Sequence, residues 1–198
     1  MRNTILMLLA ACATAGCVTL QSSYTLVPPG EVAVAQGTMT VHTTEAWNRE
    51  PRSPVSIAQE EDWTQNGPVL DQVRFVGALP DGEAIVKQKP DDDRKVPVFH
   101  AAMTPQDLAS MIESAYRIRA GAKIFETTGV KPATFLGEHG VQFDYSYVRD
   151  DSVRRLGRSL VAVSGGKLYL MSLDGTALHY YNADLLDFET MAASAKIH

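Results

Sequence analysis

Histidines are the first residues that could do chemistry, but their spacing does not assemble a site. The five histidines are His42, His100, His139, His179 and His198. A zinc site needs three or four ligands that converge, whereas these histidines fall in separate segments with no paired spacing. We therefore expect them in turns or on the surface, and we expect no bound metal or other cofactor.

Two short stretches imitate ion-binding loops. The run Asp91 to Asp93 supplies consecutive carboxylates, whereas a calcium loop of the EF-hand type places its oxygens at alternate positions around a glycine. The stretch Ser164 to Lys167 ends like a phosphate-binding loop, but it lacks the upstream glycine and the hydroxyl residue after the lysine. Both predict turns. Because the sequence also has no Gly-x-Ser-x-Gly elbow, we expect a protein that is not an enzyme.

Arginines gather near residue 150. Arg154, Arg155 and Arg158 follow Arg149, and two neighbouring aspartates partly neutralise them. On a strand, Arg154 and Arg158 share one face and Arg155 lies on the other. The group is a candidate contact patch for an acidic partner, and the alternative is an ordinary solvated sheet face.

The two cysteines, Cys12 and Cys17, lie within an export signal. The chain begins with a positive residue, Arg2, and continues through an apolar run from Ile5 to Ala11 to small residues around Cys17, which is the three-part pattern of a secretory signal. A membrane-spanning helix needs about 20 apolar residues, and this run is shorter. We therefore expect residues 1–16 to be a cleaved signal peptide.

Both cysteines follow small residues, and this pattern resembles the lipobox of bacterial lipoproteins, in which the cysteine takes a diacylglycerol and becomes the mature N-terminus. Thr14 to Cys17 leaves a workable signal length, so we expect the lipid on Cys17. Leu9 to Cys12 matches the lipobox better letter by letter, but it leaves an apolar core of only about seven residues. An ordinary cut after Ala15 is the third alternative and would release a soluble protein. The resemblance implies an exported lipoprotein that faces the periplasm from the inner or the outer membrane.

Charge and size limit the partners and the fold. The full chain has 18 Lys and Arg against 23 Asp and Glu, a net charge of −5, and loss of Arg2 makes it −6. This acidity argues against a nucleic acid or an anionic membrane surface as a partner. A cut before Cys17 leaves no thiol for a disulfide, so the fold must depend on its core. We expect a tether over residues 17–27 and a single domain over 28–198.

Strand patterns dominate that domain. Alternation of apolar with small or polar residues predicts a hairpin over 32–41 and a second hairpin from 73–79 and 83–87. Residues 49–67 read as a long loop, and residues 96–99 as a short edge strand because Pro97 would interrupt a central one. The strands of an antiparallel meander are predicted at 133–136, 141–148, 159–163 and 167–173.

Two helices accompany the strands. Thr104, Pro105 and Asp107 have the types expected at a helix start, which predicts a helix from Thr104 to about Arg119. The tail from 184 to 195 repeats apolar residues at helical spacing. The stripe consists of Leu185, Phe188, Met191, Ala192 and Ala195. Two helices packed on about six or seven antiparallel strands make one α+β domain.

The C-terminal half adds a family resemblance. A strand over 157–163, a Gly-Gly turn, a strand over 167–172 and a helix over 188–194, together with an early strand that ends at Trp47, are similar to the PsbP-like and DcrB-like αβα sandwiches. In those families the first long helix begins soon after the tryptophan, whereas here about fifty residues intervene. The resemblance implies a non-catalytic accessory or assembly module that binds an envelope protein. The alternatives are a carrier or sensor of a small apolar ligand and a periplasmic enzyme.

Overall fold

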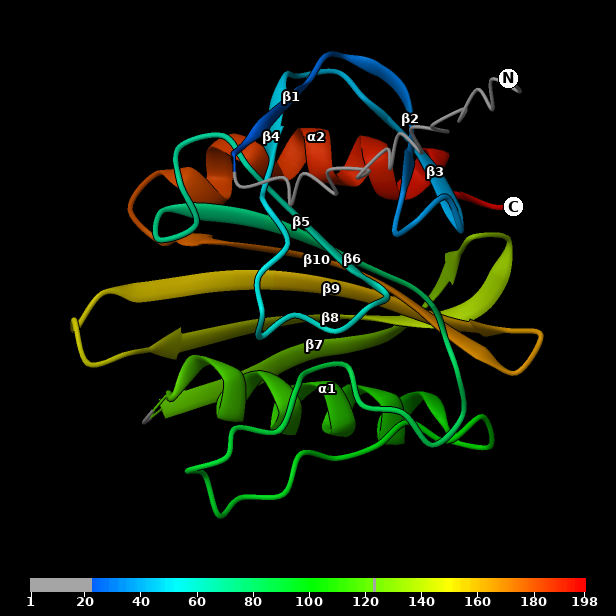
Figure 1. Cartoon of the computed structure of the whole chain (residues 1–198), viewed down its shortest axis with the longest axis vertical. Helices are drawn as coiled ribbons and strands as arrows, with labels where there is room; N and C mark the ends of the chain where they lie inside the picture. Colours follow the sequence, from blue (N-terminus) through cyan, green and yellow to red (C-terminus); the bar gives the residue numbers. More distant parts are fainter. Residues whose placement is uncertain (1–22, 123) are drawn as a thin grey trace, which may run out of the picture.

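An eight-stranded antiparallel sheet runs through the middle of the computed structural model, which describes residues 23–122 and 124–198 (Figure 1). In spatial order its strands are β1 (Thr25–Val27), β4 (Trp47–Arg49), β5 (Glu60–Thr64), β6 (Asp71–Leu79), β10 (Lys167–Thr176), β9 (Arg154–Ser164), β8 (Glu138–Val148) and β7 (Ile124–Phe135). A smaller sheet has the order β11 (Lys196–Ile197), β3 (Met39–Thr43) and β2 (Gly30–Val34). The α+β class is confirmed, with more strands than expected.

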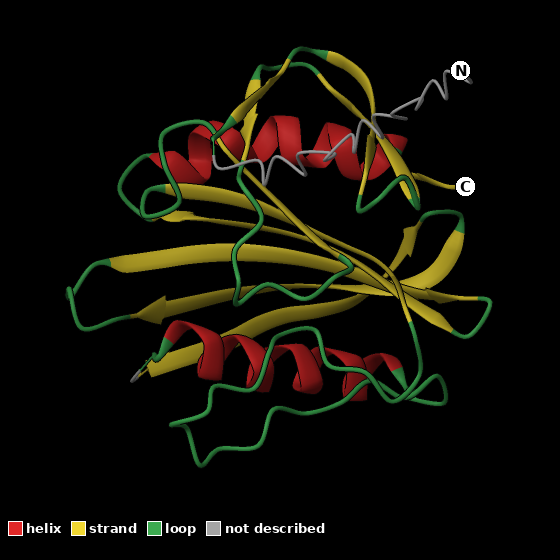
Figure 2. Cartoon of the chain, in the orientation of Figure 1, coloured by secondary structure: helices red, strands yellow, loops and turns green. Residues whose placement is uncertain are grey.

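The two helices lie on opposite faces of the large sheet (Figure 2). Helix α1 (Pro105–Ala120) covers one face and contacts β7 and β8, whereas α2 (Tyr180–Ser194) covers the other and contacts β10 and β3. Each helix closes its own cluster of buried apolar residues. Among the described residues, no helix combines the length and the apolar character that crossing a membrane requires.

Helix α1 begins and ends as its sequence predicts. The Thr104 hydroxyl accepts a hydrogen bond from the Asp107 amide, and the Asp107 carboxylate accepts one in return from the Thr104 amide, so the capping box is complete. At the other end Gly121 adopts the left-handed conformation, with φ of 61°, and closes the helix. This fixed start and stop determine which residues α1 presents to the sheet.

The meander and the first hairpin are confirmed, with longer strands than predicted. The strands β7 to β10 follow one another along the chain and pair in that order. Residues 32–41 form the β2–β3 hairpin. The turn from Ser164 to Lys167 joins β9 to β10, with Gly165 and Gly166 at positive φ.

Three predictions between residues 49 and 99 are wrong. Residues 60–64 form strand β5 rather than loop, since β6 pairs with β5 on one side and with β10 on the other. Residues 83–87 are therefore not a partner strand of β6. Residues 96–99 form no strand either, although the Phe99 amide donates to the Glu83 carbonyl at 2.7 Å. The alternating pattern there reflects burial of single side chains in loops, with Ile85 and Phe99 fully buried.

Strand β7 forms one edge of the large sheet and is irregular. It pairs with β8 alone, and the register shifts between Thr128 and Lys131. Gly129 lies inside this bulge with φ of 61°, a conformation that glycine adopts without strain. Pro132 follows within the same strand.

Helix α2 covers the second face of the large sheet, as its sequence predicts. Phe188 and Met191 are fully buried in its cluster, whereas Leu185 and Ala192 are partly buried. The apolar stripe therefore faces the sheet, as expected.

Two aspartates, which the stripe did not include, are also buried on α2. Asp187 accepts hydrogen bonds from the Thr43 hydroxyl at 2.8 Å and from the Trp47 indole at 2.7 Å. These bonds outweigh the effect of burial and lower the pKa of Asp187. Asp184 differs, because its Oδ2 has no hydrogen-bond partner among the described residues. Burial, with the neighbouring Asp71 and Asp187, raises the pKa of Asp184 to about 7.

We predict that Phe188→Ala destabilises the domain strongly. Removal of a fully buried phenylalanine costs about 3–5 kcal/mol, and Phe188 is 0% exposed. Leu186 lies on the same helix and is 75% exposed, so Leu186→Ala is a matched control that should change the free energy of unfolding by less than about 0.5 kcal/mol. Denaturant unfolding measures both variants, and a Phe188→Ala protein as stable as the wild type would contradict this core assignment.

We predict a stability that depends on pH through Asp184. The folded-state pKa lies above the unfolded value, so folding favours the protonated form, and the free energy of unfolding falls as pH rises from about 4 to about 7. Asp184→Asn should therefore stabilise the domain at pH 8 by about 1–3 kcal/mol and much less at pH 5.

Asp187→Asn is the control for that experiment. It removes a charge one helical turn away, but it should destabilise the protein at pH 8 because hydrogen bonds to the carboxylate are lost. Thermal unfolding at both pH values distinguishes the two aspartates. Equal destabilisation by both changes would mean that Asp184 is not a strained carboxyl.

Candidate functional site

The face of the sheet under α1 changes from apolar to polar along the helix. Near the start of α1, Leu108 and Ile112 belong to the same apolar cluster as Phe143 and Leu170. Near its end, the side chains on this face include Arg74 of β6 and Ser172 and Asp174 of β10, with tyrosines from α1 and β8. The polar part adjoins the end of the sheet where α1 stops.

A buried ion-pair cluster forms the back of this polar region. The Nε of Arg74 lies 2.9 Å from Oδ1 of Asp62 and 3.2 Å from Oε1 of Glu60. Arg119 reaches the same carboxylates from α1, with Nη2 2.8 Å from Oε1 of Glu60 and 3.4 Å from Oδ2 of Asp62. The Glu60 side chain is 1% exposed and that of Arg74 is 9% exposed. Arg74, Glu60 and Asp62 are therefore desolvated together, and Arg119, whose side chain is 25% exposed, closes the cluster on the solvent side.

The two acids respond differently to their surroundings. Burial opposes ionisation of Glu60, but the charges of Arg74 and Arg119 outweigh it and lower the pKa of Glu60. Burial raises the pKa of Asp62, and the adjacent charge of Glu60 adds to the effect. Glu60 is thus the permanent anion of the cluster, and Asp62 is the acid that takes up a proton more readily.

A chain of hydroxyl groups extends from the arginines along the sheet. The guanidinium carbon of Arg74 lies 5.5 Å from the centre of the Tyr116 ring, within the range of a cation–π contact. The Tyr116 hydroxyl is 2.7 Å from Oγ of Ser172, which is 2.7 Å from Oγ of Ser159. Arg74, Tyr116 and Ser172 therefore hold one another in fixed positions.

Three aromatic rings form a second wall. Phe125 of β7 stacks against Tyr145 with ring centres 5.3 Å apart, and against Tyr147 at 5.7 Å. The Tyr145 ring lies directly over Gly157 of β9, where an added Cβ would come within 2.0 Å of the ring. Glycine at this position is what allows the ring to lie flat on the sheet.

Asp174 of β10 is a third acid of this region. It is bonded to the Tyr147 hydroxyl. Burial raises the pKa of Asp174 to about 6, although the Tyr147 hydroxyl and nearby arginines act in the opposite direction. Burial also raises the pKa of Tyr147, so this phenol keeps its proton and donates a hydrogen bond to the Asp174 carboxylate.

These groups surround a cavity of about 180 Å³. Its polar lining includes Arg74, Tyr116, Arg119, Tyr147, Arg149 and Asp174. Pro68, from the β5–β6 loop, also lines it. An apolar cavity of about 150 Å³ accepts a benzene molecule, so this volume accommodates one six-membered ring.

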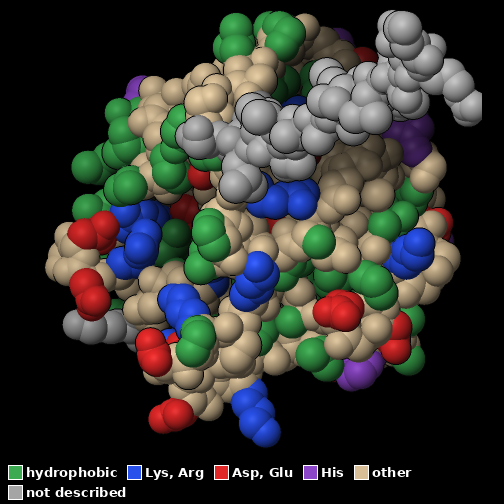
Figure 3. All heavy atoms as spheres, in the orientation of Figure 1, with side chains coloured by type: hydrophobic (Ala, Val, Ile, Leu, Met, Phe, Trp, Pro, Cys, Tyr) green, Lys and Arg blue, Asp and Glu red, His purple; other side chains and the backbone are tan. Residues whose placement is uncertain are grey.

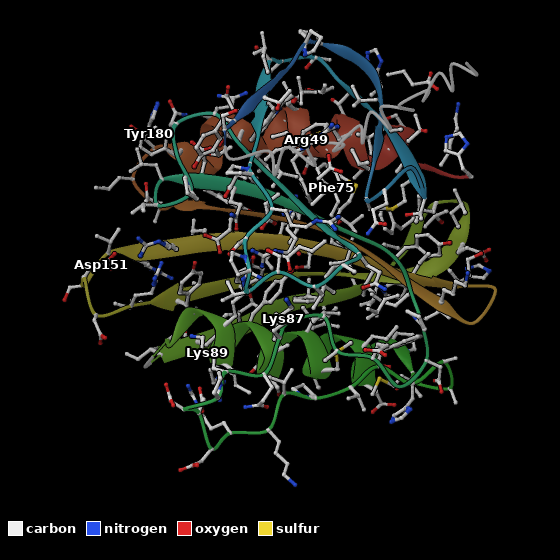
Figure 4. The ribbon with its side chains drawn as sticks, viewed as in Figure 1. Arg49, Phe75, Lys87, Lys89, Asp151 and Tyr180 are labelled. Carbon is white, nitrogen blue, oxygen red and sulfur yellow. The ribbon has the colours of Figure 1, made fainter. Side chains whose placement is uncertain are left out.

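The loops beside the cavity carry exposed side chains of mixed character. Val69 is 60% exposed, Val153 is 38% exposed, and Leu178, before α2, is 97% exposed. Figure 4 places Asp151, between β8 and β9, at the same end of the molecule as Tyr180 at the start of α2. Figure 3 shows basic, acidic and hydrophobic side chains gathered over this end.

The structure separates the arginines that the sequence grouped. Arg155 is 2% exposed, pairs with Asp151 at 2.8 Å and lies over the Tyr147 ring, on the α1 face. Arg154 and Arg158 lie on the other face, where they line a groove of about 320 Å³. Arg158 is held there by Asp144 at 2.6 Å. Whether a partner contacts these arginines stays a prediction.

The other residues singled out in the sequence lie apart from the cavity. All five histidines are exposed, and no group of metal-binding side chains occurs in the described ranges. Asp92 pairs with Arg94 at 2.6 Å in an exposed turn. Cys12 and Cys17 lie outside the described residues, so the assignment of the lipid stays a prediction.

Arg149 was noted with the arginines near residue 150, but most polar cavity residues were missed because each is an isolated polar residue in a strand or helix pattern. One signal was present in the alternation: Glu60 and Asp62 are two residues apart, as are Arg74 and Gln72, and such pairs point to one face of a strand. Charged residues of both signs on facing strands would have indicated a polar part of the interior. The segment that contains Glu60 and Asp62 was assigned to a loop, which concealed this pattern.

Comparisons with known proteins identify the fold. No family model and no curated protein sequence matches the chain. The solution structure of cyanobacterial PsbP (CyanoP) from Synechocystis sp. PCC 6803 matches with a TM-score of 0.53 and 14% identity, over 96% of this chain and 99% of that one. The Ran-binding protein Mog1p of Saccharomyces cerevisiae matches with a TM-score of 0.51 and 6% identity, over 89% and 96%. LpqN of Mycobacterium tuberculosis, described as involved in cell envelope biogenesis, has a TM-score of 0.36 and 12% identity, over 89% and 84%. The chain therefore has the PsbP-like α+β fold that its C-terminal half resembles.

Proposed function

We propose that the protein is a non-catalytic accessory module of the bacterial cell envelope, anchored by a lipid on Cys17, which binds an envelope component at the end of the domain where the cavity lies. The observation that carries this proposal is the cavity itself, a preformed hollow whose polar groups are held in place by their neighbours. Preformed concave sites with a few fixed polar groups are typical of binding sites.

The surroundings of the cavity also favour contact with a partner. Arginine, tyrosine and exposed aliphatic side chains occur together there, and protein interfaces are enriched in arginine and aromatic residues. Arg149 is exposed, and Val69 and Val153 lie in the two adjacent loops. The arginine on the opposite face differs, since Arg158 is already paired with Asp144.

Catalysis is the less favoured function for this cavity. Asp174, with its pKa raised to about 6, has a value that suits proton transfer. However, covalent catalysis also needs a nucleophile bonded to its base, and the Ser172 hydroxyl is bonded to Tyr116 and Ser159 instead. Arg74 and Arg119 are likewise occupied by Glu60 and Asp62.

A carrier of small apolar ligands is also disfavoured. An apolar molecule in this cavity would cover Arg149 and Asp174 without offering them hydrogen bonds, and buried polar groups that lose their partners cost about 1–3 kcal/mol each. The polar lining thus selects against the ligand class that such a carrier would transport.

We predict that a photo-crosslinking residue beside the cavity captures an envelope protein. p-Benzoylphenylalanine in place of Val69 or Val153 should give one discrete adduct in intact cells, identified by mass spectrometry. Val55 lies in the β4–β5 loop and is 62% exposed, close to the 60% of Val69, so it is the matched control position. The same adduct at all three positions, or none beside the cavity, would overturn the proposed function.

We predict that the mature protein begins at a lipid-modified Cys17. Mass spectrometry of the N-terminal peptide from membranes should detect a diacylglyceryl cysteine there, and Cys17→Ala should release the protein from the membrane and remove the crosslinked adduct. A modified Cys12, or an unmodified N-terminus at Gly16, would contradict the anchor while leaving the crosslinking result to be judged separately.

A further inference from the structure

We propose that the cavity binds an uncharged pyranose ring, either a free sugar or the terminal unit of a glycan. This inference rests on the proposed function: the partner protein contacts the loops beside the cavity, and the sugar occupies the cavity itself. It follows from the balance of charge in the lining, the hydrogen-bonding groups that remain available, and the size and shape of the hollow.

The lining carries charges of both signs that largely cancel. The cations Arg74 and Arg119 are paired with Glu60 and Asp62 within 3.4 Å. An anion entering the cavity would therefore have to compete with carboxylates already in place, and it would also face Asp174. A metal cation would be repelled by the same arginines. The lining thus favours a ligand without net charge.

Hydrogen-bonding groups of both kinds remain at the cavity. Asp174 is an acceptor with spare lone pairs, because among the described residues it accepts a side-chain hydrogen bond from Tyr147, and a carboxylate offers about four acceptor positions. Arg149 is exposed and lines the cavity, and its guanidinium offers donors alone. A ligand that satisfies both needs groups that donate and accept, and the hydroxyls of a sugar do so.

The three aromatic rings can contact the apolar C–H groups of a sugar. Phe125 is within 15° of parallel to both Tyr145 and Tyr147, and all three rings line the cavity. These rings are 3–8% exposed and stack on one another, so the apolar C–H groups of a pyranose can contact their exposed edges while its hydroxyls reach Asp174 and Arg149. The volume of about 180 Å³ accommodates one ring.

The test is a titration of the isotope-labelled domain, followed by amide chemical shifts. Glucose and N-acetylglucosamine are the sugar probes, and inorganic phosphate and glycine are the charged and zwitterionic probes. For a ligand of this size we expect dissociation constants of about 1–10 mM. The sugars should shift the amides of β8 and β10 residues at the cavity, and the charged probes should not.

Variants separate binding from folding. Asp174→Ala should weaken sugar binding by at least about tenfold, the loss expected for one hydrogen bond to a charged group, whereas Asp174→Asn keeps an acceptor oxygen and should retain part of the affinity. Asp91→Ala changes an exposed carboxylate that does not line the cavity and should bind like the wild type. The spectra of the unliganded variants show directly whether each is folded.

Each result decides the proposal. Sugar-specific shifts that Asp174→Ala weakens would support it, and tighter binding of a β-linked disaccharide than of its monomer would assign the ligand to a glycan end. Shifts caused by phosphate or glycine instead, sugar shifts unaffected by Asp174→Ala, or no shift with any sugar would overturn it. Crosslinking at Val69 is independent of these outcomes, so loss of the sugar hypothesis and loss of the proposed function remain distinguishable.

Discussion

The buried guanidinium of Arg74 is the constraint on which the polar half of the domain depends. Moving a charge out of water is costly, and a buried ion pair that loses one partner destabilises a protein by about 3–5 kcal/mol. The fold meets this requirement by placing Asp62 directly opposite Arg74 in the β5–β6 ladder, with Glu60 on the same face. The register of β5 against β6 therefore decides whether the buried Arg74 has its carboxylate partner.

The same charge cluster also positions the helix. Arg119 joins Glu60 and Asp62 from the last turn of α1, and Tyr116 packs against Arg74 one turn earlier. These contacts hold the end of α1 over polar side chains, where apolar packing alone would not retain it. The other face is mainly apolar, because Phe75, Met171 and Phe188 are fully buried there in a continuous cluster, and its buried Asp187 is bonded to Thr43 and Trp47. The two faces therefore differ in how far charged groups hold the helix in place.

Local signals predicted those elements that local chemistry determines. The capping box of Thr104 and Asp107 and the Gly-Gly turn at 165–166 specify their structures within a few residues, and both are confirmed. Strand β5 was missed because its pairing partner is β6, and its polar residues satisfy contacts that depend on distant segments. The cavity was missed for the same reason, since it combines residues from β6, β8, β10 and α1. Asp184 and Asp187 interrupt an otherwise apolar helix face, and their different environments arise only from tertiary contacts.

The irregular edge strand β7 affects whether two copies of the chain can pair through their sheets. Chains confined to a membrane surface by a lipid would meet one another far more often than in free solution, and an exposed strand edge is a template for pairing with a second chain. The bulge at Gly129, the adjacent Lys131 and the missing amide of Pro132 disrupt the regular row of backbone groups that such pairing needs. If the proposed lipid anchor is present, this irregular edge would disfavour pairing of neighbouring chains along the sheet.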